Sequence, residues 1–295
     1  MTGNNVYLCL DVGGMSIQYG LFDQSGVLLS KLDSVSSKNG EKSVLDILLG
    51  IVSETIKSYS IKGICVASSG VIDSEKGEVI YSGYTIPEYK GTQIKKTIET
   101  IFNLPCEVEN DVNCTALGEY WKGSGKGSNS LVCLTIGTGI GGAIMLGGSI
   151  YHGKNYSAGE IGYMKVSNEN IQDIASATSL IERVGQKKKV NLNGKEIFEA
   201  AKTGDEVSIE EIDYLLENLS VAIINIMYLL SPEKIIVAGG IINQKDYLYE
   251  KLLTKVAANI EDTFFNNSTI VFAENNKTAN LLGALFHFKK LQNID

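Results

Sequence analysis

The stretch that decides the fold is VYLCLDVGGMSIQYGLFD, residues 6–23. It consists of an apolar run that leads to Asp11, a turn with two adjacent glycines, and a second apolar run that ends at Phe22. A short apolar run that stops at glycines is typical of a buried strand entering a tight turn. The stretch therefore predicts a β-hairpin in which residues 6–10 pair with residues 17–22.

A second stretch repeats this order of features. Residues 130–146 read SLVCLTIGTGIGGAIML, which is an apolar run, a glycine-rich turn at 137–142 and a return strand. Two lobes that open alike indicate a duplication of the fold rather than of the sequence. Elsewhere, apolar residues at helical spacing alternate with short apolar runs, which is the pattern of an α/β protein. We therefore expect an α/β fold with two lobes.

The remaining elements are predicted from the same periodicities. In the first lobe we expect strands at 27–32, 63–67 and 106–109 and helices at 43–59, 91–102 and 112–121. In the second lobe we expect strands at 234–238 and 269–272 and helices at 176–184, 195–202, 209–230, 245–260 and 280–291. The small lobe is predicted at residues 1–119, joined by the C-terminal helix at about 281–295, and the large lobe at 120–280. Residues 123–128 are rich in Gly and Ser, which makes them the best candidate for a hinge.

Composition narrows the classes of function. The 295 residues are 44% hydrophobic and 20% charged, with a formal net charge of −8, which is normal for a globular protein and argues against nucleic-acid binding. The five cysteines include no C-x-x-C pair, so we expect reduced thiols. The sequence shows neither a signal peptide nor an apolar stretch long enough to span a bilayer. We expect a cytoplasmic protein that binds neither nucleic acid nor membrane.

Both glycine-rich turns suit the binding of phosphate groups. Glycine lets the backbone adopt positive φ and approach a bulky anion, and the turn N–H groups can point at its oxygens. Neither turn is a P-loop or a dinucleotide-binding fingerprint. One such turn usually only reverses the chain, but two at equivalent places indicate phosphate held from both sides. Asp11 could hold Mg²⁺ or its water shell, and Ser16 and Thr138 offer hydroxyl donors.

Asp111 directly follows a short strand and begins a helix. A carboxylate near a hydroxyl group can accept the hydroxyl proton while the bond from that oxygen to phosphorus forms. The mouth of a sheet is also where ligands of α/β proteins usually bind. A helix N-cap is the alternative role, since Asp fills that position well, and spacing alone favours the cap.

Four motifs now stand in a fixed order: DVGG at 11–14, ENDVN at 109–113, IGTGIGG at 136–142 and AGEIG at 158–162. In this order they resemble the ROK sugar kinases, which belong to the sugar kinase, actin and Hsp70-like ATPase superfamily. The resemblance extends over about residues 6–288. It implies two ribonuclease-H-like lobes with ATP and a sugar in the central cleft, and a homodimer.

The resemblance also implies a set of site residues. The ATP phosphates and adenosine would contact Asp11, Gly13, Gly14, Met15, Ser16, Gly137, Thr138, Gly139, Gly239 and Gly240, with Asp11 reaching Mg²⁺, in part through water. The sugar would contact Asn110, Asp111 and Glu160. Further candidates near the sugar, from their positions in this sequence, are Ser69, Gly70, His152, Tyr163 and Gln172. Asp111 becomes the expected catalytic base. Three alternatives stay open: Asn110 as a helix cap, Ser69 as a strand end, and His152 as a surface-loop residue.

The sequence departs from the family where a zinc site is usual. ROK proteins usually carry a His after the Ala-Gly-Glu motif and then a cysteine cluster, but this chain has Tyr163 there, and residues 165–175 contain neither Cys nor His. We therefore expect no structural zinc. The glutamate that usually closes the segment corresponds to Gln172. The missing His and Glu lie near the anomeric end of the sugar in the family, so their replacement indicates tolerance of a substituted sugar, or neutral change after loss of zinc.

These residues predict an ATP-dependent kinase that acts on a sugar hydroxyl. The 6-hydroxyl of a hexose, or of the non-reducing glucose of a β-glucoside such as cellobiose, is the expected acceptor, as in the zinc-less β-glucoside kinases and glucokinase-like members. Glucokinase, fructokinase and N-acetylmannosamine kinase activities are alternatives. A non-catalytic, sugar-sensing ROK protein is the weaker alternative, because ROK repressors carry an N-terminal helix-turn-helix domain and here the phosphate loop begins at Asp11.

Overall fold

The computed structural model describes residues 5–38, 42–83, 86–275 and 277–294. The chain forms two compact units. The first unit comprises residues 1–126, 152–158 and 277–295, and the second unit comprises residues 127–151 and 159–276. Residues 120–126 and 152–158 therefore lie in the first unit, whereas the sequence analysis assigned both to the large lobe.

The first unit contains a mixed five-stranded sheet. Its strands, in sheet order, are β3 (Asp33–Ser36), β2 (Ser16–Asp23), β1 (Val6–Val12), β4 (Ile61–Ser68) and β7 (Cys106–Asn110). The two pairs that involve β2 are antiparallel, while β1 with β4 and β4 with β7 are parallel. The register aligns Val12 with Ser68 and Ser68 with Asn110. The carboxyl ends of these three strands therefore meet at one edge of the sheet.

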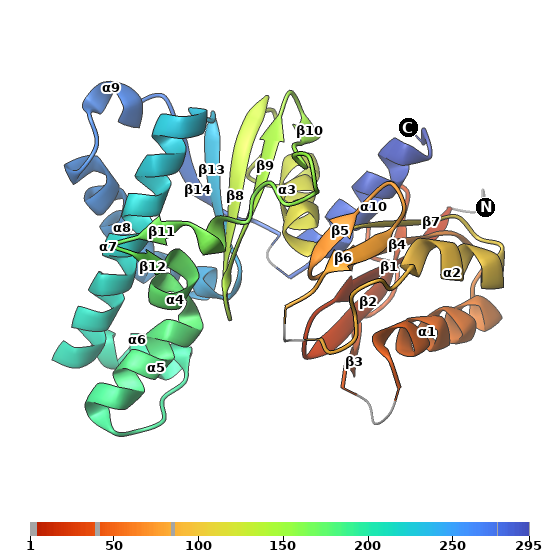
Figure 1. The fold of residues 1–295 in the computed structure, drawn as a ribbon, viewed down its shortest axis with the longest axis horizontal. Helices are drawn as coiled ribbons and strands as arrows, with labels where there is room; N and C mark the ends of the chain where they lie inside the picture. The colour runs from red at the N-terminus through yellow and green to blue at the C-terminus, as the bar shows by residue number, and fades with distance from the viewer. Residues whose placement is uncertain (1–4, 39–41, 84–85, 276, 295) are drawn as a thin grey trace. The chain divides into compact units, whose positions relative to one another are not determined.

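Alternation of side chains along β1 gives this sheet two apolar faces. Four helices cover them: α1 (Val44–Ser58), α2 (Ile94–Phe102), α3 (Asp111–Lys122) and α10 (Ala279–Leu291). Leu8 and Leu10 pack in a cluster with side chains of α1 and α2. Tyr7 and Cys9 pack in the opposite cluster, with side chains of α3 and α10. Figure 1 shows α10, in blue, among the red and orange elements of this unit, although it comes from the end of the sequence.

Two glycines allow α3 and α10 to pack with their backbones close together. A Cβ atom on Gly283 of α10 would lie 1.7 Å from the carbonyl oxygen of Cys114. A Cβ atom on Gly118 of α3 would lie 2.2 Å from the carbonyl oxygen of Ala279. No side chain fits at either position, so these glycines fix the approach of α10 to α3.

The second unit repeats the topology of the first. Its strands, in sheet order, are β10 (Ser149–Ile150), β9 (Ile140–Leu146), β8 (Ser130–Ile136), β13 (Lys234–Ala238) and β14 (Thr269–Phe272). Again the pairs that involve β9 are antiparallel, and β8 with β13 and β13 with β14 are parallel. The predicted duplication of an α/β lobe is confirmed.

The helices of the second unit surround one long helix. They are η1 (Ile161–Tyr163), α4 (Ile171–Ala175), α5 (Ala177–Lys188), α6 (Gly194–Lys202), α7 (Glu206–Leu230), η2 (Gly240–Gln244), α8 (Lys245–Ala258) and α9 (Asp262–Phe265). α7 is long and apolar enough to cross a bilayer by length and composition. However, 61% of its most apolar window is buried, and α4, α5, α6, α8 and α9 all pack against it. This is the pattern of a core helix.

The structure differs from the predicted elements at several places. The strand predicted at 27–32 is absent: β3 lies at 33–36, Phe22 and Leu28 form an isolated bridge, and Val27 and Leu29 are exposed. Two hairpins were not predicted. They are β5 (Val71–Asp73) with β6 (Glu78–Tyr81), and β11 (Lys165–Val166) with β12 (Glu169–Asn170). Strands of two to four residues are too short to show periodicity in the sequence.

Candidate functional site

Asp11 lies one residue before the carboxyl end of β1. Asn280, at the start of α10, donates a hydrogen bond from its Nδ2 to Oδ2 of Asp11, at 3.0 Å. Burial raises the pKa of Asp11 to about 6, although the hydrogen bond from Asn280 opposes the rise. A buried carboxylate is stabilised by a nearby cation, and Mg²⁺ prefers oxygen ligands. Asp11 therefore fits the predicted role at a magnesium ion.

The predicted phosphate residues Gly13, Gly14, Met15 and Ser16 form the turn between β1 and β2. The N–H of Gly13 donates to the carbonyl oxygen of Ser16, at 3.0 Å, and the N–H of Ser37 donates to the carbonyl oxygen of Met15, at 3.1 Å. The side chain of Met15 is 80% exposed. The turn is thus held by one hydrogen bond within its own backbone and one from Ser37, and Gly13 and Gly14 are partly exposed.

Asn110, and not Asp111, caps helix α3. Its Oδ1 accepts the N–H groups of Val112 and Asn113, at 2.9 and 3.0 Å, and its backbone is extended. Asp111 is the first helical residue, and its Oδ1 accepts hydrogen bonds from the N–H of Val112 and from Nδ2 of Asn110. The structure therefore gives the capping role to Asn110, and the alternative role proposed for Asp111 is removed.

Ser69 and Gly70 follow β4 at the same edge of the sheet. The N–H of Ser69 donates to the carbonyl oxygen of Val12, and Nδ2 of Asn110 donates to the carbonyl oxygen of Gly70. Gly70 has φ of +101°, and a Cβ atom there would lie 2.6 Å from the carbonyl oxygen of Tyr81, so glycine is required. The first unit thus brings together five predicted residues at one edge: Asp11, Ser69, Gly70, Asn110 and Asp111.

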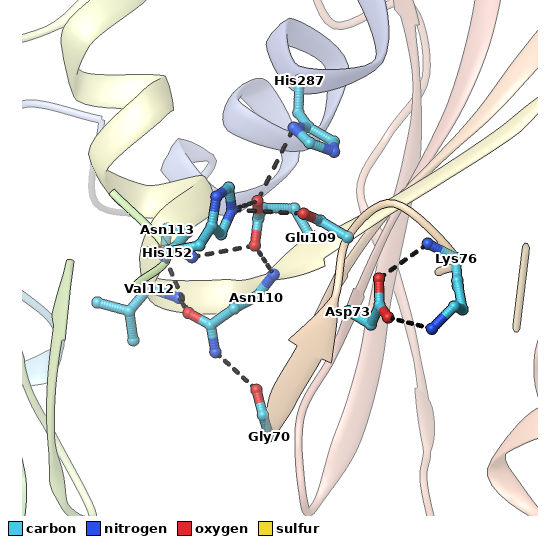
Figure 2. Close-up of polar contacts among 10 residues, drawn as sticks. Gly70, Asp73, Lys76, Glu109, Asn110, Val112, Asn113, His152 and His287 are labelled. Carbon is cyan, nitrogen blue, oxygen red and sulfur yellow. Dashed lines mark hydrogen bonds and ion pairs between the residues drawn. The ribbon is translucent and has the colours of Figure 1, made fainter. Parts of the chain in front are cut away.

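Glu109 lies directly before these residues and is fully buried. Its Oε2 accepts a hydrogen bond from Nε2 of His152, at 2.7 Å, and lies 3.9 Å from Nδ1 of His287. Figure 2 shows both imidazole rings next to this carboxylate. Burial alone would raise the pKa of Glu109, but the hydrogen bond from His152 and the proximity of His287 outweigh it and lower the pKa. The same hydrogen bond raises the pKa of His152. His152 was predicted either to contact the sugar or to be a surface-loop residue, and in the structure its Nε2 is hydrogen bonded to Glu109.

The second unit brings its own predicted phosphate residues together. Gly137, Thr138 and Gly139 form the turn between β8 and β9. The N–H of Gly137 donates to the carbonyl oxygen of Gly139, and the carbonyl oxygen of Gly137 accepts the N–H of Ala177 at the start of α5. Gly239 has φ of +87°, and a Cβ atom there would lie 2.6 Å from the carbonyl oxygen of Ile136. Gly239 and Gly240 therefore adjoin the entrance of this turn.

These loops fit the phosphates of a nucleotide. In the part of the chain that the structure describes, no heavy atom lies within 4 Å of a Cβ position on Gly137 or Gly240, so a ligand can approach both. The sole arginine in the sequence, Arg183, binds Glu211 and the carbonyl oxygen of Ile174. Backbone N–H groups of a glycine turn can bind phosphate without an arginine side chain.

Glu160, Tyr163 and Gln172 belong to the second unit. Glu160 directly precedes η1 and is exposed, but partial desolvation of its carboxyl group raises its pKa. Tyr163 is 52% exposed. Oε1 of Gln172 lies 3.0 Å from the Cβ position on Gly162 and 3.2 Å from that on Gly139. Gln172 therefore contacts the glycine turn as well as the segment after Glu160. The role of these three residues at the sugar stays a prediction.

Hydrogen bonds hold the segment 165–175, for which the sequence analysis expected no structural zinc. The β11–β12 hairpin leads into α4, and the N–H of Ile171 donates to the carbonyl oxygen of Met164, at 2.9 Å. Nη1 of Arg183 donates to the carbonyl oxygen of Ile174, at 2.8 Å. Within residues 5–38, 42–83, 86–275 and 277–294, no three His, Cys, Asp or Glu side chains gather in a way that could hold a metal ion.

Two residues of the site were missed from the sequence. Asn280 gives no local signal, since it is a polar residue near a helix start like many others. Glu109 carries a weak signal, because it is a charged residue in a strand of which four of the five residues are buried. A charge in such a strand indicates a specific partner.

Known proteins resemble this chain along nearly its whole length. An uncharacterized protein of Clostridium perfringens (strain 13 / Type A) is 40% identical over 289 residues, with 97% of this chain and 98% of that protein covered. The β-glucoside kinase of Listeria innocua is 28% identical, with 96% and 97% covered. The glucokinase of Halalkalibacterium halodurans is 31% identical, with 83% of each chain covered.

A solved structure shows the fold. The crystal structure of a ROK family glucokinase from Streptomyces griseus, in complex with glucose and AMPPNP, matches with a TM-score of 0.81 and 24% identity, covering 96% of this chain and 98% of that one. The chain thus has the two-lobe α/β fold of ROK sugar kinases. The sequence profile of the ROK family matches residues 7–290, and the chain belongs to this family.

Proposed function

We propose that this protein is a carbohydrate kinase that transfers the γ-phosphoryl group of ATP to a sugar hydroxyl. The observation that carries the proposal is the position of Asp111. It stands at the carboxyl edge of the sheet with Asp11 and Gly70, and Asn110 takes over the capping of α3. The kinase names of the relatives support the same reaction.

Different residues of the chain have different roles in this reaction. Asp111 accepts the proton of the attacking hydroxyl, which makes the oxygen a better nucleophile. The turns at Gly13–Ser16 and Gly137–Gly139 hold the phosphates through backbone N–H groups. Asp11, oriented by Asn280, would hold Mg²⁺ directly or through its water shell. The bound cation would supply charge neutralisation at the transferring phosphate.

For the acceptor we propose the 6-hydroxyl of a hexose or of the non-reducing glucose of a β-glucoside such as cellobiose. The support is the replacement of the family's His and Glu by Tyr163 and Gln172, and the likeness to a β-glucoside kinase. Glucokinase, fructokinase and N-acetylmannosamine kinase activities are the alternatives. A higher kcat/KM for cellobiose than for glucose is the expected result, and a much higher kcat/KM for glucose would contradict it.

We also propose that the protein is a cytoplasmic homodimer. Three partly exposed apolar side chains of α7 recur every seven residues, at Tyr214, Val221 and Tyr228, and therefore lie on one side of the helix. Leu229 beside them is 78% exposed. Light scattering after size-exclusion chromatography measures the mass directly, and the mass of a monomer at micromolar concentration would contradict the proposal.

The experiment that tests the function is ADP release with Mg-ATP in the presence of single sugars. The panel is glucose, fructose, mannose, N-acetylmannosamine, N-acetylglucosamine, cellobiose and a methyl β-glucoside. Sugar-dependent ADP release is expected with at least one of them, and it should require Mg²⁺. Release that never exceeds the rate without sugar would contradict the proposed function.

A further inference from the structure

The buried carboxylate of Glu109 joins two separate parts of the first unit. Its Oε1 accepts the N–H of Asn110, at 2.6 Å, and Nδ2 of Asn113, at 3.0 Å, in the first turn of α3. Its Oε2 accepts Nε2 of His152, at 2.7 Å. One side chain therefore connects the helix start that carries Asp111 with the segment that begins at His152 (Figure 2).

The segment 152–158 is a short excursion of the chain into the first unit. The residues before and after it, Tyr151 and Gly159, belong to the second unit. His152, the first residue of the segment, is hydrogen bonded to Glu109. The N–H of Ala158, its last residue, donates to the carbonyl oxygen of His152, at 3.1 Å. The segment is thus a closed loop whose ends meet at His152.

A second contact fixes the middle of this loop. The phenol group of Tyr156 hydrogen bonds to the carboxylate of Asp73, which also accepts the N–H and Nζ of Lys76. The rings of Tyr156 and His152 meet edge to face, with centroids 5.7 Å apart. The loop is therefore held at two points. Among the described residues, His152 is the only residue of the loop that contacts the carboxylate of Glu109.

A buried ion pair is a poor way to gain stability, because the desolvation of both charges offsets most of their attraction. What the pair of Glu109 and His152 supplies instead is a fixed geometry, since the carboxylate has defined hydrogen-bond directions on both oxygens. The same carboxylate also orients Asn110 and Asn113.

We infer that His152 is a positioning residue, which acts through Glu109 to fix the first turn of α3 with Asp111 and to hold the loop that leads to Glu160. This inference rests on the proposed kinase function, in which Asp111 is the base and Glu160 contacts the sugar. It replaces the predicted direct contact between His152 and the sugar. A base displaced by about 1 Å loses roughly a hundredfold in rate, so a device of this kind affects catalysis.

The test compares two substitutions of His152. His152→Leu keeps most of the volume and removes the donor, whereas His152→Gln keeps an N–H donor near the position of Nε2. We expect His152→Leu to lower kcat about tenfold to a hundredfold, and His152→Gln to restore most of it, with little change in the KM for ATP. Lys154→Leu, at an exposed position of the same loop, is the matched control and should match the wild type.

Hydrogen exchange gives a readout that does not depend on activity. His152→Leu should speed exchange in peptides that cover 152–158 and also in those that cover 110–116, while peptides of α1 stay unchanged. If exchange in 110–116 stayed at the wild-type rate, or if only the KM for the sugar rose with kcat intact, His152 would not act through Glu109. A wild-type protein inactive on every sugar would contradict the proposed function instead, and the exchange comparison would still decide this inference.

Discussion

Nδ2 of Asn280 donates a hydrogen bond to Oδ2 of Asp11 across 269 positions of sequence. The hydroxyl group of Thr115 hydrogen bonds to Oδ1 of the same Asn280 and also lies 3.0 Å from the carbonyl oxygen of Asp111. Asp11 and Asp111, the two acids with the main proposed roles, are thus both linked by hydrogen bonds to Asn280, Asp111 through its carbonyl oxygen and Thr115. Because Asn280 belongs to α10, the site depends on residues from both ends of the chain.

Asp11→Asn should stabilise the ligand-free protein at neutral pH and abolish phosphotransfer. The pKa of Asp11 rises from 3.8 to about 6 on folding, so the unfolded chain loses this proton first. The wild type therefore has the full contribution of this group below about pH 4 and loses it as the pH rises through about 6. The loss reaches at most ~3 kcal/mol, from a shift of about two units.

Urea denaturation between pH 4 and pH 8, with a chelator present, measures this difference. The variant and the wild type should agree near pH 4 and diverge above it, with the variant more stable. A constant difference at every pH would contradict the raised pKa of Asp11.

Asp111→Asn should remove catalysis and leave the fold intact. Loss of the base should lower kcat by roughly a hundredfold to ten-thousandfold. Because Asn110 provides the cap, the free energy of unfolding should change by less than about 1 kcal/mol. Asp246→Asn, an exposed acid in the first turn of α8, is the control and should keep full activity. An Asp111→Asn protein with wild-type turnover would show that Asp111 is not the base.

Gly283→Ala should destabilise the first unit strongly. The new Cβ atom would lie 1.7 Å from the carbonyl oxygen of Cys114, so α10 must move away from α3. Overpacking of this kind costs roughly 1–3 kcal/mol or more. Gly50→Ala in α1 is the matched control, because its Cβ position meets no described atom within 4 Å. That variant should gain about 0.5–1 kcal/mol from helix propensity.

Chemical denaturation of both glycine variants decides this prediction. Opposite signs of the change in stability are expected. Equal effects would mean that backbone contact does not fix the α3–α10 packing.

Arg183→Lys should destabilise the segment 165–175. Arg183 binds Glu211, donates to the carbonyl oxygen of Ile174 and stacks on Tyr214, and lysine cannot keep all three contacts. We expect a loss of about 1–2 kcal/mol in the free energy of unfolding. Lys187→Gln removes a half-exposed partner of the same Glu211 and should cost about 0–1 kcal/mol. A larger cost for Lys187→Gln would contradict the role of Arg183.

Much of the architecture could be predicted from local sequence. The hairpins at 6–23 and 130–146 and the helix after Asp111 follow from apolar periodicity and glycine turns, and the structure has all three. The strand at 27–32 was predicted wrongly, because an apolar run there is exposed and pairs only at Leu28. A run of apolar residues does not say whether a sheet partner is available.

Less of the candidate site could be predicted from the sequence. The edge with Asp11, Ser69 and Asn110 follows from parallel strands that end in register, and the motifs marked it. Asn280 could not be found, and His152 was predicted as a sugar contact and not as a partner of Glu109, because both residues reach their partners through tertiary packing and not through spacing. The capping role also depended on side-chain geometry, since Asn110 and Asp111 are adjacent and both are good caps.

The seating of α10 in the first unit has a consequence for biosynthesis. The sheet face that carries Tyr7, Cys9 and Phe22 is covered by Leu281, Leu285 and Phe288. A ribosome makes residues 5–126 long before it makes 279–291, so this apolar face stays open while the second unit is translated and folds. The nascent chain therefore exposes an apolar surface for the time needed to add about 150 residues, roughly 8 to 30 seconds at about 5–20 residues per second. Slow translation of the second half would lengthen the period in which the nascent protein depends on chaperones.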